Sequence, residues 1–137
     1  MNYGMFFEKV CLIPLFFLSL SSSVAAEWTV VQEREGSVTY SYENGRIFLE
    51  VVDFGKNSQM TMNKAKEIYT SQVGCEEEDE FQIHGRQLYH YMCPEYVHIY
   101  LTEKNPGSLL QLGGICNKGN DCDAVMSFVA DYIKKLP

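Results

Sequence analysis

The chain has 137 residues, of which 46% are hydrophobic, and its formal net charge at pH 7 is −7. This length suits one domain of ordinary size. The acidic balance argues against nucleic acid and anionic membrane surfaces as partners, because their phosphate groups would repel it, whereas a basic protein is compatible with it.

The first 26 residues have the pattern of a secretory signal peptide. Lys9 precedes an apolar run at residues 10–20, and a series of small residues ends at Ala26. The run is too short for a membrane helix, which needs about 18 or more apolar residues. We therefore expect cleavage after Ala26, no stable membrane anchor afterwards, and a single domain at 27–137. The expected location is the periplasm, with the extracellular medium as the alternative.

The first elements after the signal read as β-strands. Residues 27–35 alternate around Trp28 and predict an opening strand. The segment 36–55 predicts a hairpin, because Asn44-Gly45 is a favoured dipeptide for a type I′ turn. This turn sets the register, which brings six residues to one apolar face. The expected pairs are Tyr42 with Ile47, Tyr40 with Leu49, and Val38 with Val51.

The next segment, 58–74, changes to a helical period. Met62, Ala65, Tyr69 and Val73 recur at that spacing, Ser58 or Thr61 can cap the start, and Gly74 can end the helix. The acidic run 76–80 follows and is expected to form a loop. An additional strand at 79–85 stays open.

Residues 87–103 predict a second hairpin. If Pro94-Glu95 is a two-residue loop, Cys93 pairs with Tyr96, Tyr91 with His98, and Tyr89 with Tyr100. His90 then lies on the opposite, core face and is expected to be half-buried. Proline is not a standard residue at such a turn, so a longer loop with a shifted register is the alternative.

A further strand at 107–116 and a closing helix at 120–136 complete the order of elements. The helix has an apolar stripe, and its terminal charges complement the helix dipole. Because hairpins dominate, we predict an α+β fold. Its antiparallel sheet has about five to seven strands with two helices (β-β-β-α-β-β-β-α), both on one face, in a two-layer sandwich. The stripe consists of Val125, Phe128, Val129, Tyr132, Ile133 and Leu136.

Four cysteines remain after the signal, namely Cys75, Cys93, Cys116 and Cys122. An even number in an exported chain predicts two disulfides, with three possible pairings. We favour Cys75–Cys93 and Cys116–Cys122 because both are local. The spacings Cx17C and Cx5C match a zinc site poorly.

The sequence contains no pattern that indicates catalysis or a cofactor. No nucleophile elbow, Cys-x-x-Cys or EF-hand pattern is present. His84, His90 and His98 lack metal-ligand spacing, and the expected hairpin places His90 and His98 on opposite faces. Oxygen ligands at 117–123 are better explained by turn formation and helix capping. We therefore expect neither an enzyme, nor a resident metal, nor a cofactor.

Binding to another protein remains the best expectation. Tyrosine is favoured at interfaces because it combines rigid contact area with a polar tip. The tyrosine-rich face is either a binding surface or core beneath the closing helix, and the acidic run is either a docking patch or a solvated loop. The candidate partner-binding residues are Glu76, Glu77, Glu78, Asp79, Glu80, Tyr89, Tyr91, Tyr96, His98 and Tyr100.

These features together favour a small exported inhibitor. An immunity protein that neutralises an envelope-targeting toxin, or a lysozyme inhibitor, has this size, charge and cysteine content. Its partner is then a basic toxin or hydrolase. The alternatives are an accessory subunit of an envelope assembly or secretion system, and a carrier of a small molecule or lipid.

Overall fold

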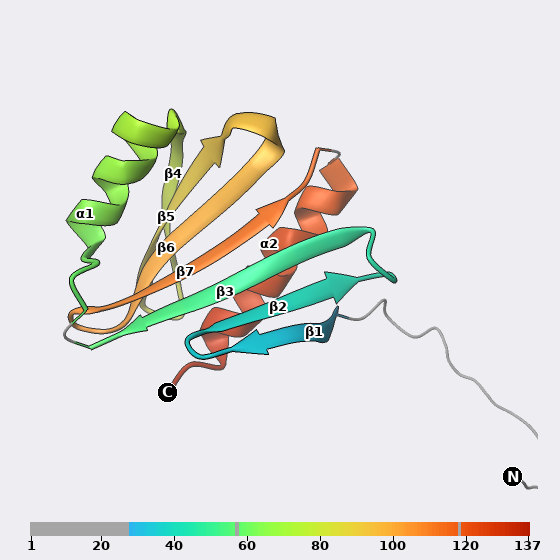
Figure 1. Cartoon of the computed structure of the whole chain (residues 1–137), viewed down its shortest axis with the longest axis horizontal. Helices are drawn as coiled ribbons and strands as arrows, with labels where there is room; N and C mark the ends of the chain where they lie inside the picture. Colours follow the sequence, from blue (N-terminus) through green and yellow to red (C-terminus); the bar gives the residue numbers. More distant parts are fainter. Residues whose placement is uncertain (1–27, 57, 118) are drawn as a thin grey trace, which may run out of the picture.

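The computed structural model describes residues 28–56, 58–117 and 119–137. The expected signal peptide at 1–26 lies outside the described residues. Within them, seven strands form one sheet, and every neighbouring pair is antiparallel (Figure 1). The predicted α+β fold class is therefore confirmed, and a strand at 76–83 overlaps the additional strand considered at 79–85.

The sheet has the order β1-β2-β3-β7-β6-β5-β4. Two runs of consecutive strands are joined where β3 lies beside β7, so β1 and β4 form the two edges. The strands are β1 (Trp28–Arg34), β2 (Ser37–Tyr42), β3 (Ile47–Gly55), β4 (Glu76–Ile83), β5 (Arg86–Cys93), β6 (Val97–Asn105) and β7 (Ser108–Ile115).

The register predicted for the β2–β3 hairpin is confirmed. Tyr42 pairs with Ile47, Tyr40 with Leu49, and Val38 with Val51. Positive φ angles extend over three turn residues, with values of 50° at Glu43, 58° at Asn44 and 95° at Gly45. Across this turn the Arg46 side chain also donates to the Glu43 carboxylate, with a nitrogen–oxygen distance of 2.7 Å.

The helices lie on opposite faces of the sheet, so the expectation of a shared face and of a two-layer sandwich is wrong. Helix α2 (Gly119–Lys134) packs against β3 and β7, and its Val125, Val129 and Ile133 are fully buried. Helix α1 (Met62–Glu67) continues as the π-helix η2 (Ile68–Val73), which belongs to a second core on the other side (Figure 1).

The cause lies in β5 and β6, whose side chains are apolar on both faces. The core beneath α2 is the first core, and the core beneath α1 and η2 is the second. Leu88 and Tyr100 point into the first core, whereas Tyr91, Ile99 and Leu101 point into the second. A strand that is apolar on both faces requires cover on each side. The second helix therefore stabilises the face that α2 does not reach.

The ends of the first helical segment agree with its sequence. The Thr61 hydroxyl accepts a hydrogen bond from the Lys64 amide, and Gly74 ends the segment with a φ of 87°. Ala65 is buried as predicted, but Val73 is 45% exposed because the change to a π-helix alters the helical period.

Candidate functional site

The acidic run is an edge strand, not a loop. Residues 76–80 are all exposed, and within the part of the chain that the structure describes β4 pairs on its β5 side only. A bulge between Glu77 and Asp79 interrupts the pairing with β5. Farther along β4, Phe81 and Ile83 pack against the first core, which holds the strand on the sheet. We call residues 76–80 the acidic edge.

A disulfide fixes the start of the acidic edge. Cys75 is bonded to Cys93 at the end of β5, and their Cα atoms are 4.0 Å apart. The Cys75 amide also donates to the Tyr69 carbonyl at 2.8 Å, and both cysteines are buried. The backbone is therefore anchored immediately before the first acidic side chain. The second disulfide is Cys116–Cys122, so both predicted pairings are confirmed.

The predicted tyrosine-rich face does not form, because the β5–β6 register differs by one residue. The turn has three residues, the short helix η3 (Pro94–Tyr96), and Cys93 therefore pairs with Val97 and Tyr91 with Ile99. A shift of one residue sends every side chain of a strand to the other face. The expected pairing of Tyr91 with His98 is thus wrong, and the alternative of a longer loop with a shifted register is confirmed.

The shift divides the candidate aromatic residues. Tyr91 packs near α1 and is 1% exposed, whereas Tyr100 and His98 point toward α2 and are 5% and 6% exposed. These three side chains belong to the interior, so none of them is part of an exposed binding surface. Tyr89 is half-buried, with the Lys66 ammonium 3.3 Å from the centre of its ring.

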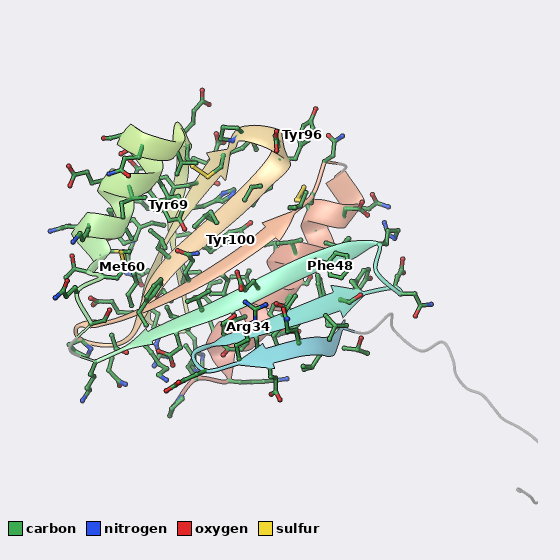
Figure 2. The ribbon with its side chains drawn as sticks, in the orientation of Figure 1. Arg34, Phe48, Met60, Tyr69, Tyr96 and Tyr100 are labelled. Atoms are coloured by element: carbon green, nitrogen blue, oxygen red, sulfur yellow. A yellow bond between two sulfur atoms is a disulfide. The ribbon has the colours of Figure 1, made fainter. Side chains whose placement is uncertain are left out.

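Tyr96 is the candidate aromatic residue that remains on the surface. It is 55% exposed at the turn after β5, where Figure 2 shows it at one end of the sheet. Met92, which pairs with Glu76 of the acidic edge, is 39% exposed. We call Tyr96 and Met92 the apolar tip. It adjoins the disulfide-anchored end of the acidic edge. Met92 is not among the candidate residues from the sequence, because the expected hairpin puts it on the same face as His90, toward the core.

The same shift brings His90 and His98 together, although opposite faces were expected. His90 Nε2 lies 2.9 Å from His98 Nδ1, and the ring of His90 stacks on Tyr100 with centroids 4.5 Å apart. Burial and the neighbouring His98 lower the pKa of His90, and burial lowers the pKa of His98. Both imidazoles are therefore neutral at neutral pH. The expectation of a half-buried, hydrogen-bonded His90 is confirmed.

Burial also changes the acidity of Tyr100, since it raises the pKa of the phenol to about 12. The stacked rings thus form an uncharged layer between the sheet and α2. At the rim of this layer, the Asp79 carboxylate of the acidic edge lies 3.8 Å from His90 Nδ1.

A groove of about 870 Å³ lies between α2 and strands β1 and β2. Its aromatic rings pack on one another, with centroids 5.0 Å apart for Trp28 and Phe128 and 4.7 Å for Tyr40 and Phe128. Sequence reasoning placed Tyr40 and Tyr42 on an apolar face but missed the groove, because its depth depends on where α2 crosses the sheet. Its lining includes Trp28, Tyr40, Tyr42, Phe128, Tyr132 and Asp131.

No family model, no curated protein and no solved structure matches this chain. Among the described residues, no helix is both long enough and apolar enough to cross a membrane. The two disulfides indicate an oxidising, non-cytoplasmic compartment.

Proposed function

We propose that this chain is an exported, periplasmic protein that binds and inhibits a basic protein through the acidic edge and the apolar tip. The observation that carries the proposal is the arrangement of five exposed acidic side chains on an edge strand, anchored by a disulfide. An immunity protein against an envelope-targeting toxin and a lysozyme inhibitor are the two forms of this function.

Each part of the surface supports a different step of binding. The acidic edge supplies long-range attraction, which accelerates association with a basic partner and aligns it. The apolar tip supplies desolvated contact, since Tyr96 is an exposed aromatic of the type that dominates interface energies. The outer side of β4 also presents backbone amide and carbonyl groups that an added strand can pair with.

The acidic edge is tested by charge removal. In the edge variant, Glu76, Glu77, Glu78 and Glu80 become Gln and Asp79 becomes Asn. The matched control makes the same five changes at exposed positions elsewhere, namely Glu33, Glu35, Glu67, Glu103 and Asp131. Both variants lose the same charge, so a net-charge effect alone would slow both equally.

Lysozyme is the first probe and the product of the neighbouring gene is the second. Stopped-flow association at low and high salt measures the steering. We expect the edge variant to associate at least about tenfold more slowly at low salt, with a weaker salt dependence than the control. Equal rates in the two variants would remove the acidic edge from the mechanism, and failure of wild-type protein to bind either probe would overturn the inhibitory function.

The apolar tip is tested by Tyr96→Ala, with Phe48→Ala as its control. The two side chains are 55% and 50% exposed, and Phe48 lies on β3, away from the β5–β6 turn (Figure 2). We expect Tyr96→Ala to increase the dissociation rate by tenfold or more, because truncation of an interface aromatic costs about 2 kcal/mol. If Phe48→Ala increases the dissociation rate equally, the contact lies on the face of the sheet that carries Phe48 and not at the apolar tip.

The aromatic groove favours a second candidate function, the transport of a small organic ligand. Its volume of about 870 Å³ lies in the range of ligand sites, and its lining combines aromatic rings with charged side chains such as Asp123, Asp131 and Lys135. Native mass spectrometry of freshly purified protein tests this function. A copurifying ligand that is lost in Phe128→Ala would support it, and protein without added mass would oppose it.

A further inference from the structure

A compact group of sulfur and nitrogen atoms lies where β6, the end of β7 and the first turn of α2 meet. The ligand atoms of His98, Cys116 and Cys122 all lie within 4.8 Å of one another. His98 Nε2 is 3.8 Å from Cys122 Sγ. His98 is 6% exposed and Cys116 is 4% exposed, so the group is largely shielded from water.

The neighbours of His98 hold its ring with Nε2 near the sulfur atoms. His98 Nδ1 lies 2.9 Å from His90 Nε2, and the other nitrogen of His90, Nδ1, lies 3.8 Å from the Asp79 carboxylate. His98 Nε2 is therefore the ring nitrogen on the side of Cys122, 3.8 Å from its Sγ. Burial lowers the pKa of His98, and a hydrogen bond with the Cys116 backbone acts against this effect. Metal binding at Nε2 requires that the neutral ring carries its proton on Nδ1.

Two thiolates and one imidazole are a characteristic ligand set for zinc. In tetrahedral geometry, with Zn–S of ~2.3 Å and Zn–N of ~2.0 Å, the nitrogen and sulfur ligand atoms are about 3.6 Å apart. The observed separation of 3.8 Å between His98 Nε2 and Cys122 Sγ is close to this value. Zinc binding would thus require mainly that the two bonded sulfur atoms separate.

We propose that reduction of the Cys116–Cys122 disulfide converts this group into a Zn²⁺ site, with Cys116, Cys122 and His98 Nε2 as the protein ligands and water in the fourth position. A dithiol reductant supplies two electrons and two protons and is itself oxidised to a disulfide. Each cysteine then releases its proton to solvent as it binds the metal. Two thiolates balance the charge of Zn²⁺, which makes the burial of the ion favourable.

Two features of the fold prepare this site. Cys122 lies in the first helical turns of α2, where the helix dipole stabilises a thiolate. His90 and Asp79 orient His98 in the manner of the outer partners of zinc-bound histidines. The other disulfide has no such environment, since among the described residues no histidine joins Cys75 and Cys93 in a comparable group.

The test uses Cys75→Ala/Cys93→Ala, in which Cys116–Cys122 is the one disulfide that remains among the described residues. The variant is reduced with a phosphine, which becomes its oxide with oxygen from water, and excess reductant is removed without air. Zn²⁺ is then titrated in competition with a chromophoric chelator. Co²⁺ serves as a second probe, because its thiolate charge-transfer absorption reports Co–S bonds directly.

We expect one equivalent of Zn²⁺ to bind to the reduced variant and none to the oxidised variant. His98→Gln should lower the affinity by more than about tenfold and His90→Gln by about tenfold, whereas His84→Gln at an exposed turn should have no effect. Stoichiometric binding by oxidised protein, absence of binding after reduction, or an unchanged affinity in His98→Gln would each overturn the proposal. If His98→Gln does not fold, absence of the Co–S absorption in the reduced parent variant is the refuting result.

Discussion

The two disulfides should stabilise the fold to different extents, because they close chain segments of different length. Cys75–Cys93 joins residues 18 positions apart, whereas Cys116–Cys122 joins residues 6 positions apart. In the chain-entropy model a cross-link restricts the unfolded chain more strongly when its loop is longer. The model gives about 3 kcal/mol for Cys75–Cys93 and about 2 kcal/mol for Cys116–Cys122.

Replacing the cysteines would change the free energy of unfolding both through the lost cross-link and through the lost side-chain packing. Cys75 and Cys93 are each 7% exposed in the second core, and Cys116 is 4% exposed in the first. We therefore compare oxidised and reduced forms of the same double-alanine variant. In Cys116→Ala/Cys122→Ala the difference reports the longer cross-link alone, and Cys75→Ala/Cys93→Ala reports the shorter one.

The assay is equilibrium unfolding in urea, followed by far-ultraviolet circular dichroism with a chelator present throughout. The free energy of unfolding should fall by about 1 kcal/mol more when the longer cross-link is reduced, because the enclosed lengths differ threefold. If reduction of the shorter cross-link costs as much or more, local anchoring of α2 would dominate over the entropy of the unfolded chain, and the reasoning would be refuted.

Two further predictions concern the core and one ion pair. Val129→Ala should lower the free energy of unfolding by about 2 kcal/mol, because the side chain is fully buried, whereas Val31→Ala, at a side chain 53% exposed, should change it by less than ~0.5 kcal/mol in the same urea titration. The hydrogen bond from Lys104 lowers the pKa of Asp53 below its ordinary value, so the pair stabilises the fold above about pH 4 and this contribution is lost as pH falls through the lowered pKa. Because both side chains are 32% exposed, the ion pair should contribute at most ~1 kcal/mol to the free energy of unfolding. The urea midpoints of wild type and Asp53→Asn should therefore differ at neutral pH, and the difference should shrink toward pH 3. A difference that stays constant with pH would contradict the prediction.

The sequence predicts structure well where local chemistry determines it. Asn44-Gly45 specified the β2–β3 register correctly, because few residues adopt positive φ and this dipeptide does so readily. The turn at Pro94–Tyr96 was not predictable in the same way. Glu95 and Tyr96 both have a φ of 65°, which ordinary side chains adopt only when the surrounding fold imposes it. That turn adds one residue and exchanges the two faces of β6.

The one additional residue in the Pro94–Tyr96 turn explains most of the differences between the predicted and the observed candidate site. It places His98 beside His90, and it moves Tyr100 into the first core. It also leaves Tyr96 exposed in the turn instead of paired on β6 (Figure 2). The placement of α1 on the second face follows from the same cause, because the shifted β6 presents Ile99 and Leu101 there.

The proposed function gives the acidic edge a role in binding, and its position on a paired strand fits that role. Acidic residues are poor strand formers, and adjacent like charges repel one another. A flexible loop would give the same solubility without this cost, yet here the run is paired with β5, preceded by a buried disulfide and followed by Phe81 and Ile83 in the core. A strand spaces its side chains at ~3.3 Å per residue in a fixed order. Successive side chains of a strand point to opposite faces, so the acidic edge presents its charges in a fixed order on both sides of β4. Places where a fold overrides local preference are expected to be functional or strained, which is consistent with the proposed binding function.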